Sequence, residues 1–448
     1  MKKMTALLAA LLLLLSGCTP KSQIHQITYL DLFDTVTVIS SATCTDADFQ
    51  TQARKIHDDL QQYHCLFDIY NDYEGISNLK TVNDNAGIAP VTVDRAIIDL
   101  LLDCRSYYDL TGGTVNVCMG SVLRLWHEAR TAGLEDPQNA FLPERSALEE
   151  AALHTSWESV LIDEENSTVF LTDPAQSLDV GAIAKGWSVQ RVADTLPGGI
   201  LISLGGNVCA TGPKTEEGTP WIIGVNDPDG GSNYLCTVEM SKGSAVTSGD
   251  YQRYYTVGGV NYHHIIDPVT LMPSAHWTSV TVLCDDSGLA DALSTALFLA
   301  DLETGQAILD KCGAEAMWRI MIDLAMNAGE SPVRVKDIAS RQNISEKYLE
   351  QIIALFNKAG YVKSVRGAQG GYLLTKEPGE YTAGMILRLA EGSIAPVSCV
   401  DSEAEGCDKK GACVSAMLWQ KMNDAVNEVV DNTTLQDLVD WQNGIAEE

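Results

Sequence analysis

The sequence lacks features that would indicate several common functional classes. Its twelve cysteines include no CxxC pair, which argues against zinc ribbons and thioredoxin-type redox motifs. Basic residues are scarce, with 30 Lys and Arg against 60 Asp and Glu, so the formal net charge is -30. A chain of this charge repels nucleic acids and anionic membranes. Any binding to DNA must therefore be local.

Internal repeats and low-complexity segments are also absent. The chain is nevertheless long, at 448 residues, and 45% of these are hydrophobic, which is typical of a folded protein. A single hydrophobic core rarely extends beyond about 250–300 residues. The length therefore predicts two domains.

The first twenty residues resemble an export signal. Lys2 and Lys3 precede an apolar run that ends at Leu15, and Ser16 and Gly17 then lead to Cys18. Spanning a bilayer takes roughly 20 apolar residues, so this run is too short for a transmembrane helix. The lipobox pattern predicts a lipoprotein signal over residues 1–18 and a polar tether over 19–27. A plain signal peptide or anchor is the alternative. Lipidation of Cys18 would place the protein at the cell membrane, lipid-anchored on the extracytoplasmic face.

Residues 28–320 alternate strand-like and helix-like stretches. Thr35–Ile39 is rich in β-branched residues, whereas Asp46–Leu66 carries apolar residues at helical spacing. Strands are expected over Ser159–Leu171 and Gly199–Leu204, with a helix between them. This alternation predicts an α+β domain.

Two glycine-bearing turns in this domain could face a phosphate. Over residues 177–194 a strand leads to Gly181 and a helix that contains Lys185; backbone amides and a lysine at such a turn can bind an anion. The alternative is a capped helix with a solvated lysine. Over residues 201–212 a strand runs into Gly205 and Gly206, which either admit a ligand or form a simple turn.

Two further stretches carry titratable and oxygen-bearing side chains. Residues 247–273 place Arg253, His264 and Asp267 around a predicted hairpin, where they are either structural or part of a functional loop. Residues 288–302 form a predicted helix with Asp291, Ser294 and Thr295 on one face. These oxygens suit Mg²⁺, although a carboxylate near a helix N-terminus is also favoured by the helix dipole.

Seven ordered segments together resemble the family of ApbE-type FAD:protein FMN transferases. They are FDIYND at 67–72, TGGTVNVCMGSVLRLW at 111–126, DVGAIAKG at 179–186, LGGN at 204–207, SGDYQRYY at 248–255, HIIDP at 264–268 and DALST at 291–295. The resemblance implies Mg²⁺-dependent transfer of FMN from FAD to a Thr or Ser hydroxyl of an acceptor protein, with release of AMP.

The resemblance also implies roles for individual residues. FAD would contact a set of residues from several segments, namely Tyr70, Thr114, Val115, Asn116, Asp179, Lys185 and Ile265. Mg²⁺ would be held by the Ala182 carbonyl and by oxygens at Asp291, Ser294 and Thr295. His264 lies at the position of the family's proposed catalytic histidine, which we interpret as a general base or as a group that orients the acceptor hydroxyl.

This chain departs from the family pattern at three places. An acidic residue is common in the family near Val115-Asn116, and some members have glycine where Ala182 stands. After the Asp-Pro pair the family has arginine-threonine-glycine, whereas this chain has Val269-Thr270-Leu271. The missing glycine at Leu271 is expected to affect the turn beneath His264.

From about residue 321 the pattern becomes that of a winged helix-turn-helix. A helix from Val335 and a second from Ser345 to Lys358 precede two strands near Gly367 and Gly371, and Ser345 is a suitable N-cap. Residues 334–376 contain eight Lys or Arg against three Asp or Glu, so this stretch is locally basic. A protein-contact module with solvated basic residues is the alternative.

This region, residues 321–448, resembles the winged-helix regulators that include the iron-sulfur sensors IscR and NsrR. That family places three cysteines after a long dimerisation helix, and here they would be Cys399, Cys407 and Cys413. They are either ligands of an iron-sulfur cluster with an unidentified fourth ligand or unligated thiols. About ten residues expected before Met321 do not match, which predicts a first helix truncated at the junction.

The two halves imply different locations. A lipobox directs everything behind it across the membrane, away from chromosomal DNA, so DNA binding is not expected of the exported chain. Three hypotheses remain: an exported flavin transferase with an incidental tail, a cytoplasmic redox regulator, and two reading frames joined only in the gene model. The abrupt change near Ile320-Met321 favours fusion of two neighbouring genes.

Overall fold

The computed structural model describes residues 24–228, 234–251, 253–327, 331–342, 346–367, 370–391, 394–395, 400 and 413–447. Contacts divide the chain into unit 1, Met1–Leu299, and unit 2, Ala300–Glu448. Cys18, Ser345, Cys399 and Cys407 lie outside the described residues.

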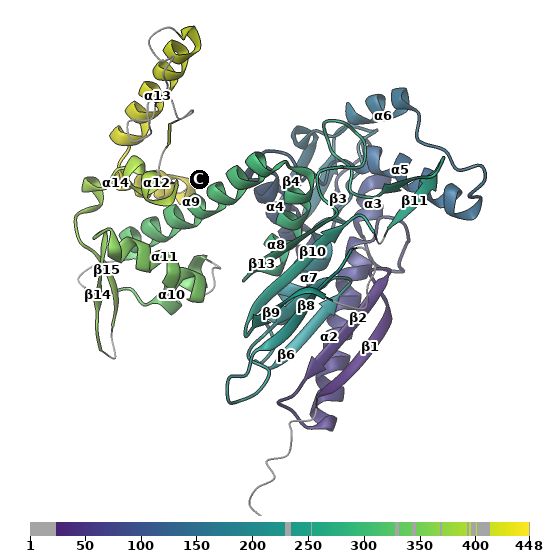
Figure 1. The fold of residues 1–448 in the computed structure, drawn as a ribbon, viewed down its shortest axis with the longest axis horizontal. Helices are drawn as coiled ribbons and strands as arrows, with labels where there is room; N and C mark the ends of the chain where they lie inside the picture. The colour runs from purple at the N-terminus through teal and green to yellow at the C-terminus, as the bar shows by residue number, and fades with distance from the viewer. Residues whose placement is uncertain are drawn as a thin grey trace, which may run out of the picture. The chain divides into compact units, whose positions relative to one another are not determined.

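Unit 1 is built on a six-stranded antiparallel sheet (Figure 1) with the strand order β1-β2-β6-β7-β10-β13. Its strands are β1 (His25–Leu32), β2 (Thr35–Ser41), β6 (Ile200–Leu204), β7 (Asn207–Ala210), β10 (Gly243–Gly249) and β13 (Ser279–Cys284). Ile39 of β2 lies opposite Ile202 of β6, and both are buried. β-branched residues in register thus form one apolar face of the sheet.

Three helices pack against this sheet and complete the core. They are α2 (Asp46–Phe67), α7 (Ala184–Ala193) and α8 (Ser287–Leu299). The Thr45 hydroxyl accepts a hydrogen bond from the Asp48 amide and caps α2. Phe49, Ile56 and Leu60 of α2 pack with Val189 of α7 and Leu204 of β6. The expected α+β fold is confirmed, and α2 and α8 begin within one residue of their expected starts.

Smaller elements surround the main layer of unit 1. Helices α3 (Leu79–Asp84), α4 (Arg95–Leu110), α5 (Gly120–Glu135) and α6 (Arg145–Ala152) accompany a small sheet of β3 (Val91–Thr92), β5 (Thr168–Leu171) and β4 (Val160–Asp163). Two hairpins are formed by β8 (Trp221–Asn226) with β9 (Tyr234–Met240) and by β11 (Tyr254–Val257) with β12 (Val260–His263). Trp126 of α5 packs near Tyr255 and Tyr262 of the second hairpin, which places α5 beside the histidine-bearing strand.

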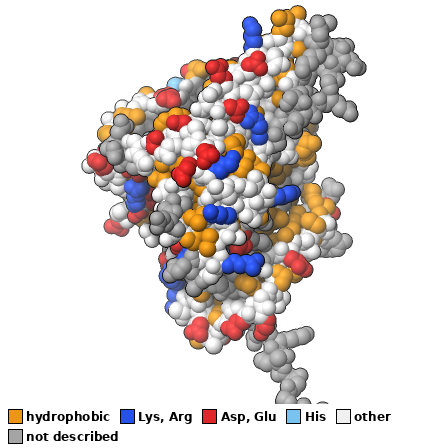
Figure 2. All heavy atoms as spheres, turned by 90° about the vertical axis from the view of Figure 1, so that its left-hand side faces the viewer, with side chains coloured by type: hydrophobic (Ala, Val, Ile, Leu, Met, Phe, Trp, Pro, Cys, Tyr) orange, Lys and Arg blue, Asp and Glu red, His pale blue; other side chains and the backbone are white. Residues whose placement is uncertain are grey.

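Unit 2 is mostly helical with one two-stranded wing, which confirms the winged helix. Its elements are α9 (Leu302–Asn327), α10 (Val335–Gln342), α11 (Glu346–Lys358), β14 (Val362–Val365), β15 (Gly371–Leu374), α12 (Ala383–Glu391), α13 (Val414–Asn432) and α14 (Leu435–Glu447). Their core contains Leu324, Ile338, Ile353 and Phe356. Seen from the side of this unit, Lys and Arg side chains are interspersed with Asp and Glu (Figure 2), so this view shows no uniformly basic surface.

Helix α9 runs through the boundary expected at residues 320 and 321. Met317, Ile320, Met321 and Leu324 recur at helical spacing, and all four are buried in the core of unit 2. The residues just before 321 therefore belong to the first helix of the winged-helix unit, which is longer than the truncated helix expected from the sequence. Only Ala300 and Asp301 separate α9 from α8.

The cysteine region also differs from expectation. The 19-residue helix α13 begins directly after Cys413, whereas the helix before this region, α12, has nine residues. The long helix thus follows the cysteines rather than preceding them. Within the described residues no helix is both long and apolar enough to cross a membrane.

Candidate functional site

A pocket of about 350 Å³ in unit 1 collects the predicted site residues. Eleven of the twelve predicted for this unit line it, namely Tyr70, Thr114, Val115, Asn116, Asp179, Ala182, Lys185, His264, Ile265, Asp291 and Thr295. They come from five sequence segments that the sheet and its helices bring together. Ser294 is the exception.

The most deeply buried charged group of the pocket is the Asp291 carboxylate on α8. Its Oδ2 accepts a hydrogen bond of 2.8 Å from the Gly186 amide of α7 and lies 3.9 Å from Lys185 Nζ. Burial raises the pKa of Asp291, while the Lys185 charge and the Gly186 N–H act in the opposite direction. A cation beside this carboxylate favours its ionised form.

The close approach of α7 and α8 requires glycine at position 186. A Cβ there would lie 2.2 Å from the Ser287 carbonyl oxygen and 2.6 Å from Asp291 Cβ. Because the Gly186 amide donates to Asp291, it does not close the helical hydrogen bond to the Ala182 carbonyl four residues earlier. Among the described residues no hydrogen bond to that carbonyl is recorded, so the Ala182 oxygen remains available at the pocket wall.

The hydroxyls of α8 divide between pocket and core. Ser294 is fully buried; its Oγ donates to the Asp291 carbonyl at 3.0 Å and lies 2.9 Å from Ser248 Oγ. Thr295, one residue later, lines the pocket. The structure therefore brings Ala182, Asp291 and Thr295 together but turns the Ser294 hydroxyl away, because a helical serine can bond back to the preceding turn.

Replacing Ser294 by alanine is expected to leave the Mg²⁺ concentration for half-maximal activity within about threefold of the original value. The Ser294 hydroxyl forms hydrogen bonds with Ser248 and with the helix backbone. Removing it should therefore lower the free energy of unfolding by about 1–2 kcal/mol. Titration of activity with Mg²⁺ and thermal unfolding measure the two effects. A tenfold or larger shift in the Mg²⁺ requirement would assign the hydroxyl to the metal.

The oxygens that remain fit Mg²⁺. A backbone carbonyl, one carboxylate and one hydroxyl are hard donors, and Mg²⁺ typically takes one or two carboxylates together with water and substrate phosphates. Within the described residues no group of three or more His, Cys, Asp or Glu side chains could hold a metal by itself. A metal at Asp291 would complete its coordination with water or substrate oxygens.

Asp179 organises the turn before α7. Its Oδ1 accepts a hydrogen bond of 2.9 Å from the Gly181 amide, and its own amide donates to the Val117 carbonyl. Burial raises the pKa of Asp179, against the opposing effect of Gly181, His127 and Lys185. Lys185 Nζ in turn donates to the Gly181 carbonyl at 3.1 Å. The turn thus presents a lysine to the pocket from a fixed backbone.

The two adjacent histidines have different environments. His263 is buried; its Nε2 donates to the Ser274 carbonyl at 2.7 Å and its Nδ1 accepts from the Ile265 amide. Both of its ring nitrogens are therefore engaged in holding the loop. The His264 ring is open to the pocket, and its Nδ1 donates to the Arg253 carbonyl at 3.3 Å. This leaves His264 Nε2 as a proton acceptor.

The protein around His264 keeps its imidazole neutral. Burial lowers the pKa of His264 to about 3, and the charges of Arg253 and Lys185 act in the same direction. The ring nevertheless remains open to the pocket. A neutral imidazole at pH 7 can accept a proton.

The turn beneath His264 forms without the family's glycine. Leu271 adopts φ +60°, a left-handed conformation that is unfavourable for a residue other than glycine by roughly 1–2 kcal/mol. Its side chain is buried near Trp126, whose Nε1 donates to the Leu271 carbonyl at 3.0 Å. Apolar burial and this hydrogen bond offset the backbone strain of the turn.

Both polar side-chain atoms of Asn116, another residue of the pocket wall, already form hydrogen bonds within the protein. Its Nδ2 donates to the Thr155 carbonyl and its Oδ1 accepts from the Cys118 amide, each at 3.0 Å. The Val115 amide donates to the Thr111 hydroxyl. These bonds hold the segment after α4 against the pocket and leave backbone and apolar atoms to meet a ligand.

Among the pocket-lining residues that were not predicted are His127, Arg130, Asn207 and Arg253. Asn207 and Arg253 lie inside the quoted segments and His127 directly follows one, so motif membership could have suggested them. Asn207 is 1% exposed, and its Nδ2 has no hydrogen-bond partner among the described residues. Its amide lies close enough to Asp291 to lower that group's pKa. A buried amide that faces a pocket beside Asp291 is a candidate donor to a ligand oxygen.

Comparisons with known proteins match both units. A model described as the ApbE family matches residues 33–318, and one described as an iron-dependent transcriptional regulator, Rrf2, matches residues 311–441. Residues 311–318 of α9 are matched by both. The second match also begins ten residues before Met321, in agreement with the untruncated helix.

Individual relatives agree with the two matches. The FAD:protein FMN transferase of Treponema pallidum is 35% identical over 269 residues, which cover 56% of this chain and 71% of the relative. The HTH-type transcriptional regulator CymR of Bacillus subtilis is 45% identical over 128 residues, 29% of this chain and 87% of the relative.

Solved structures match the first unit. The ApbE protein of Thermotoga maritima is 31% identical with a TM-score of 0.55, covering 64% of this chain and 90% of that one. The flavin transferase ApbE of Vibrio cholerae is 25% identical with a TM-score of 0.52, covering 64% and 91%.

Proposed function

The chain belongs to the ApbE family through residues 33–318, and from this premise we propose that it transfers FMN from FAD to a Thr or Ser hydroxyl of an acceptor protein in a Mg²⁺-dependent reaction. The observation that carries the proposal is the convergence of Asp291, Thr295, the Ala182 carbonyl, Lys185 and His264 on one pocket. C-terminal residues 311–441 belong to the Rrf2 family.

The chemistry follows from the groups at the pocket. The acceptor hydroxyl oxygen forms a bond to the phosphorus on the FMN side of FAD, the bond from that phosphorus to the bridging oxygen breaks, and AMP leaves with that oxygen. His264 Nε2 accepts the hydroxyl proton. Lys185 balances negative charge on the phosphates. Mg²⁺ held by Ala182, Asp291 and Thr295 would neutralise the pyrophosphate.

The direct test uses the chain from Thr19 with FAD, Mg²⁺ and a flavin-acceptor domain. We expect AMP release and a fluorescent acceptor whose mass has increased by one FMN unit at a Thr or Ser. The acceptor with that residue changed to alanine is the control. Neither AMP nor labelled acceptor in the presence of bound FAD would contradict the proposal.

The pH dependence of the reaction tests the role of His264. Because the pKa of His264 is lowered, its neutral form is present throughout neutral pH and is lost only as the pH falls towards 3. We therefore expect kcat/KM for FAD to change little from pH 8 to pH 6. A histidine at the ordinary value of about 6.5 would be roughly three quarters protonated at pH 6. An inflection near 6.5 that disappears in His264→Ala would contradict this assignment.

We further propose that the protein is anchored through Cys18 on the extracytoplasmic face of the membrane. The lipobox supports this, and Cys18→Ala should release the protein from the membrane fraction or leave it unprocessed. A variant that behaves like the original chain in both respects would contradict the anchor.

The second candidate function is DNA binding by unit 2, with a redox or iron-sulfur response. Membership of residues 311–441 in the Rrf2 family favours it. The anaerobically purified full chain should then show visible iron-sulfur absorbance and retard DNA. Mass spectrometry of the native product distinguishes the alternatives, because a product that ends near residue 320 would show that the two parts are separate proteins.

A further inference from the structure

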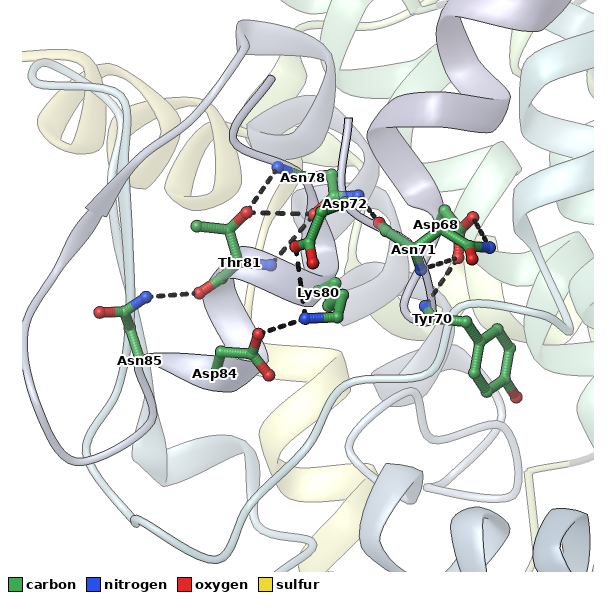
Figure 3. Close-up of polar contacts among 9 residues, drawn as sticks. All are labelled: Asp68, Tyr70, Asn71, Asp72, Asn78, Lys80, Thr81, Asp84 and Asn85. Atoms are coloured by element: carbon green, nitrogen blue, oxygen red, sulfur yellow. Dashed lines mark hydrogen bonds and ion pairs between the residues drawn. The ribbon is translucent and has the colours of Figure 1, made fainter. Parts of the chain in front are cut away.

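The loop between α2 and α3 is folded around the carboxylate of Asp68. Asp68 Oδ1 accepts hydrogen bonds from the Tyr70 and Asn71 amides at 2.7 and 3.2 Å. Asp68 Oδ2 accepts from Asn71 Nδ2 at 2.9 Å and from the Tyr73 hydroxyl at 2.8 Å. Figure 3 shows this carboxylate beside the Tyr70 backbone, with the Tyr70 ring pointing away from the cluster.

These four hydrogen bonds determine the charge of Asp68. Burial acts to raise the pKa of Asp68, but the bonds from Asn71, Tyr70 and Tyr73 outweigh it and hold the pKa below its ordinary value. The carboxylate is therefore ionised at neutral pH, when it accepts charge-assisted hydrogen bonds.

The far side of the loop is held as well (Figure 3). Asn78 is fully buried, and its Nδ2 donates to the Asn71 carbonyl at 2.8 Å. Lys80 Nζ pairs with Asp72 at 3.3 Å and with Asp84 at 2.6 Å. The backbone on both sides of Tyr70 is thus restrained before any ligand arrives, which reduces the entropy lost when Tyr70 binds one.

The ring held in this way stacks on a second ring. Tyr70 and His127 of α5 lie with centroids 4.9 Å apart and planes inclined by 27°. Both line the pocket, and the Tyr70 side chain remains 52% exposed. A large aromatic surface left open inside a pocket is suited to a planar ligand.

We propose that Tyr70 and His127 form a two-ring platform on which one planar ring system of FAD stacks, and that Asp68 is the residue that positions this platform. The inference rests on the proposed function and deepens it, because it adds His127 and Asp68 to the FAD site. His127 supports the Tyr70 ring from α5, while Asp68 fixes the direction in which the Tyr70 side chain leaves the loop.

The platform is tested by measuring the Kd for FAD with the chain that starts at Thr19, at saturating Mg²⁺. Quenching of flavin fluorescence reports the binding. We expect His127→Ala to raise the Kd for FAD on the order of five- to tenfold, because the Tyr70 ring loses the aromatic partner that supports it. His127→Phe keeps a ring and should stay within about threefold of the original Kd. In turnover, His127→Ala should raise KM for FAD more than it lowers kcat.

A matched histidine control exists outside the pocket. His57 also packs on a tyrosine, with its centroid 4.3 Å from that of Tyr29, but it does not line the pocket. His57→Ala should leave the Kd for FAD unchanged. A His127→Ala protein that binds FAD within twofold of the original chain would overturn the platform.

The positioning role of Asp68 has its own control. Asp163 caps a turn in the same way, with Oδ1 accepting from the Asn166 amide at 3.0 Å and Oδ2 from Asn166 Nδ2 at 2.8 Å, away from the pocket. Asp68→Ala should weaken FAD binding severalfold, and Asp163→Ala should not. If Asp68→Ala does not fold, Asp68→Asn, which keeps the shape, takes its place. Equal Kd values for the Asp68 and Asp163 variants would overturn the positioning role.

Competition identifies the stacked ring. If the flavin stacks on the platform, His127→Ala should weaken the competition of FMN with FAD and leave the competition of AMP unchanged. If adenine stacks there, the variant should weaken competition by AMP and leave that by FMN unchanged. A variant in which neither FMN nor AMP competes less well would overturn the proposal. Binding is read separately from transfer, so a chain that binds FAD on the platform but never labels an acceptor would contradict the proposed function alone.

Discussion

Replacing Asp291 by asparagine is expected to lower the rate of FMN transfer by about a thousandfold without unfolding the protein. Asp291 is the one carboxylate among the three oxygens that face the proposed metal site. Loss of its charge removes metal-dependent stabilisation of several kcal/mol, and about 4 kcal/mol corresponds to a thousandfold. The measurement is single-turnover transfer at saturating FAD.

Stability should respond in the opposite sense. Asparagine keeps an oxygen for the Gly186 amide, and burial already raises the pKa of Asp291. Removing the charge should therefore leave the metal-free Tm equal or higher. Addition of Mg²⁺ with FAD should raise the Tm of the original chain but not that of the variant, because only the former binds the ligand tightly.

Asp286, the residue immediately before the same helix, provides the matched control. It is half-buried and burial raises its pKa, but it accepts a hydrogen bond from the Leu289 amide and does not line the pocket. Asp286→Asn should retain activity within a few fold, because asparagine also serves as an N-cap. Equal losses in both variants would remove Asp291 from the metal site.

The second large effect is expected at Gly186, where alanine should lower the free energy of unfolding by about 2 kcal/mol or more. Alanine improves helix propensity by about 1 kcal/mol. However, its Cβ would lie 2.2 Å from the Ser287 carbonyl oxygen, and this backbone atom cannot move without shifting α8. Overpacking of this kind outweighs the propensity gain. Because α8 carries Asp291, transfer should fall as well.

Gly198→Ala is the comparison for this variant. The nearest atom to a Cβ at Gly198 lies 3.6 Å away, which is ordinary contact, so its effect should be below 1 kcal/mol. Thermal and chemical unfolding measure both. A Gly186→Ala protein as stable as Gly198→Ala would mean that α7 and α8 are not packed as closely as described.

Local patterns were sufficient for the elements that position the site. Apolar spacing located α2, and the ordered segments located most of the pocket residues because several of them lie where a strand ends or a helix begins, as at Gly205 after β6 and at Lys185 in α7. Pairings between distant segments were not predictable in this way. The Gly186 amide meets Asp291 across 105 positions of sequence, and the pattern of neither helix records that contact.

The directions of individual side chains could not be predicted from the sequence either. Ser294 and Thr295 share a helix face by spacing, yet the Ser294 hydroxyl bonds back to the Asp291 carbonyl, a choice that depends on Ser248 from β10. At Leu271 the missing glycine indicated a changed turn. In the structure Leu271 adopts a left-handed backbone, and its burial near Trp126 compensates for the strain. Such compensation comes from tertiary packing and is not visible in the local sequence.

The short connection from α8 to α9 through Ala300 and Asp301 affects how readily proteases can separate the two parts of the chain. Proteases cut most readily where a chain is extended and exposed, and between these two helices there is almost no such chain. A housekeeping protease therefore finds little to trim that would release the winged helix from the transferase. If the two parts are translated as one polypeptide, they are synthesised and degraded together, and the cell contains equal numbers of both.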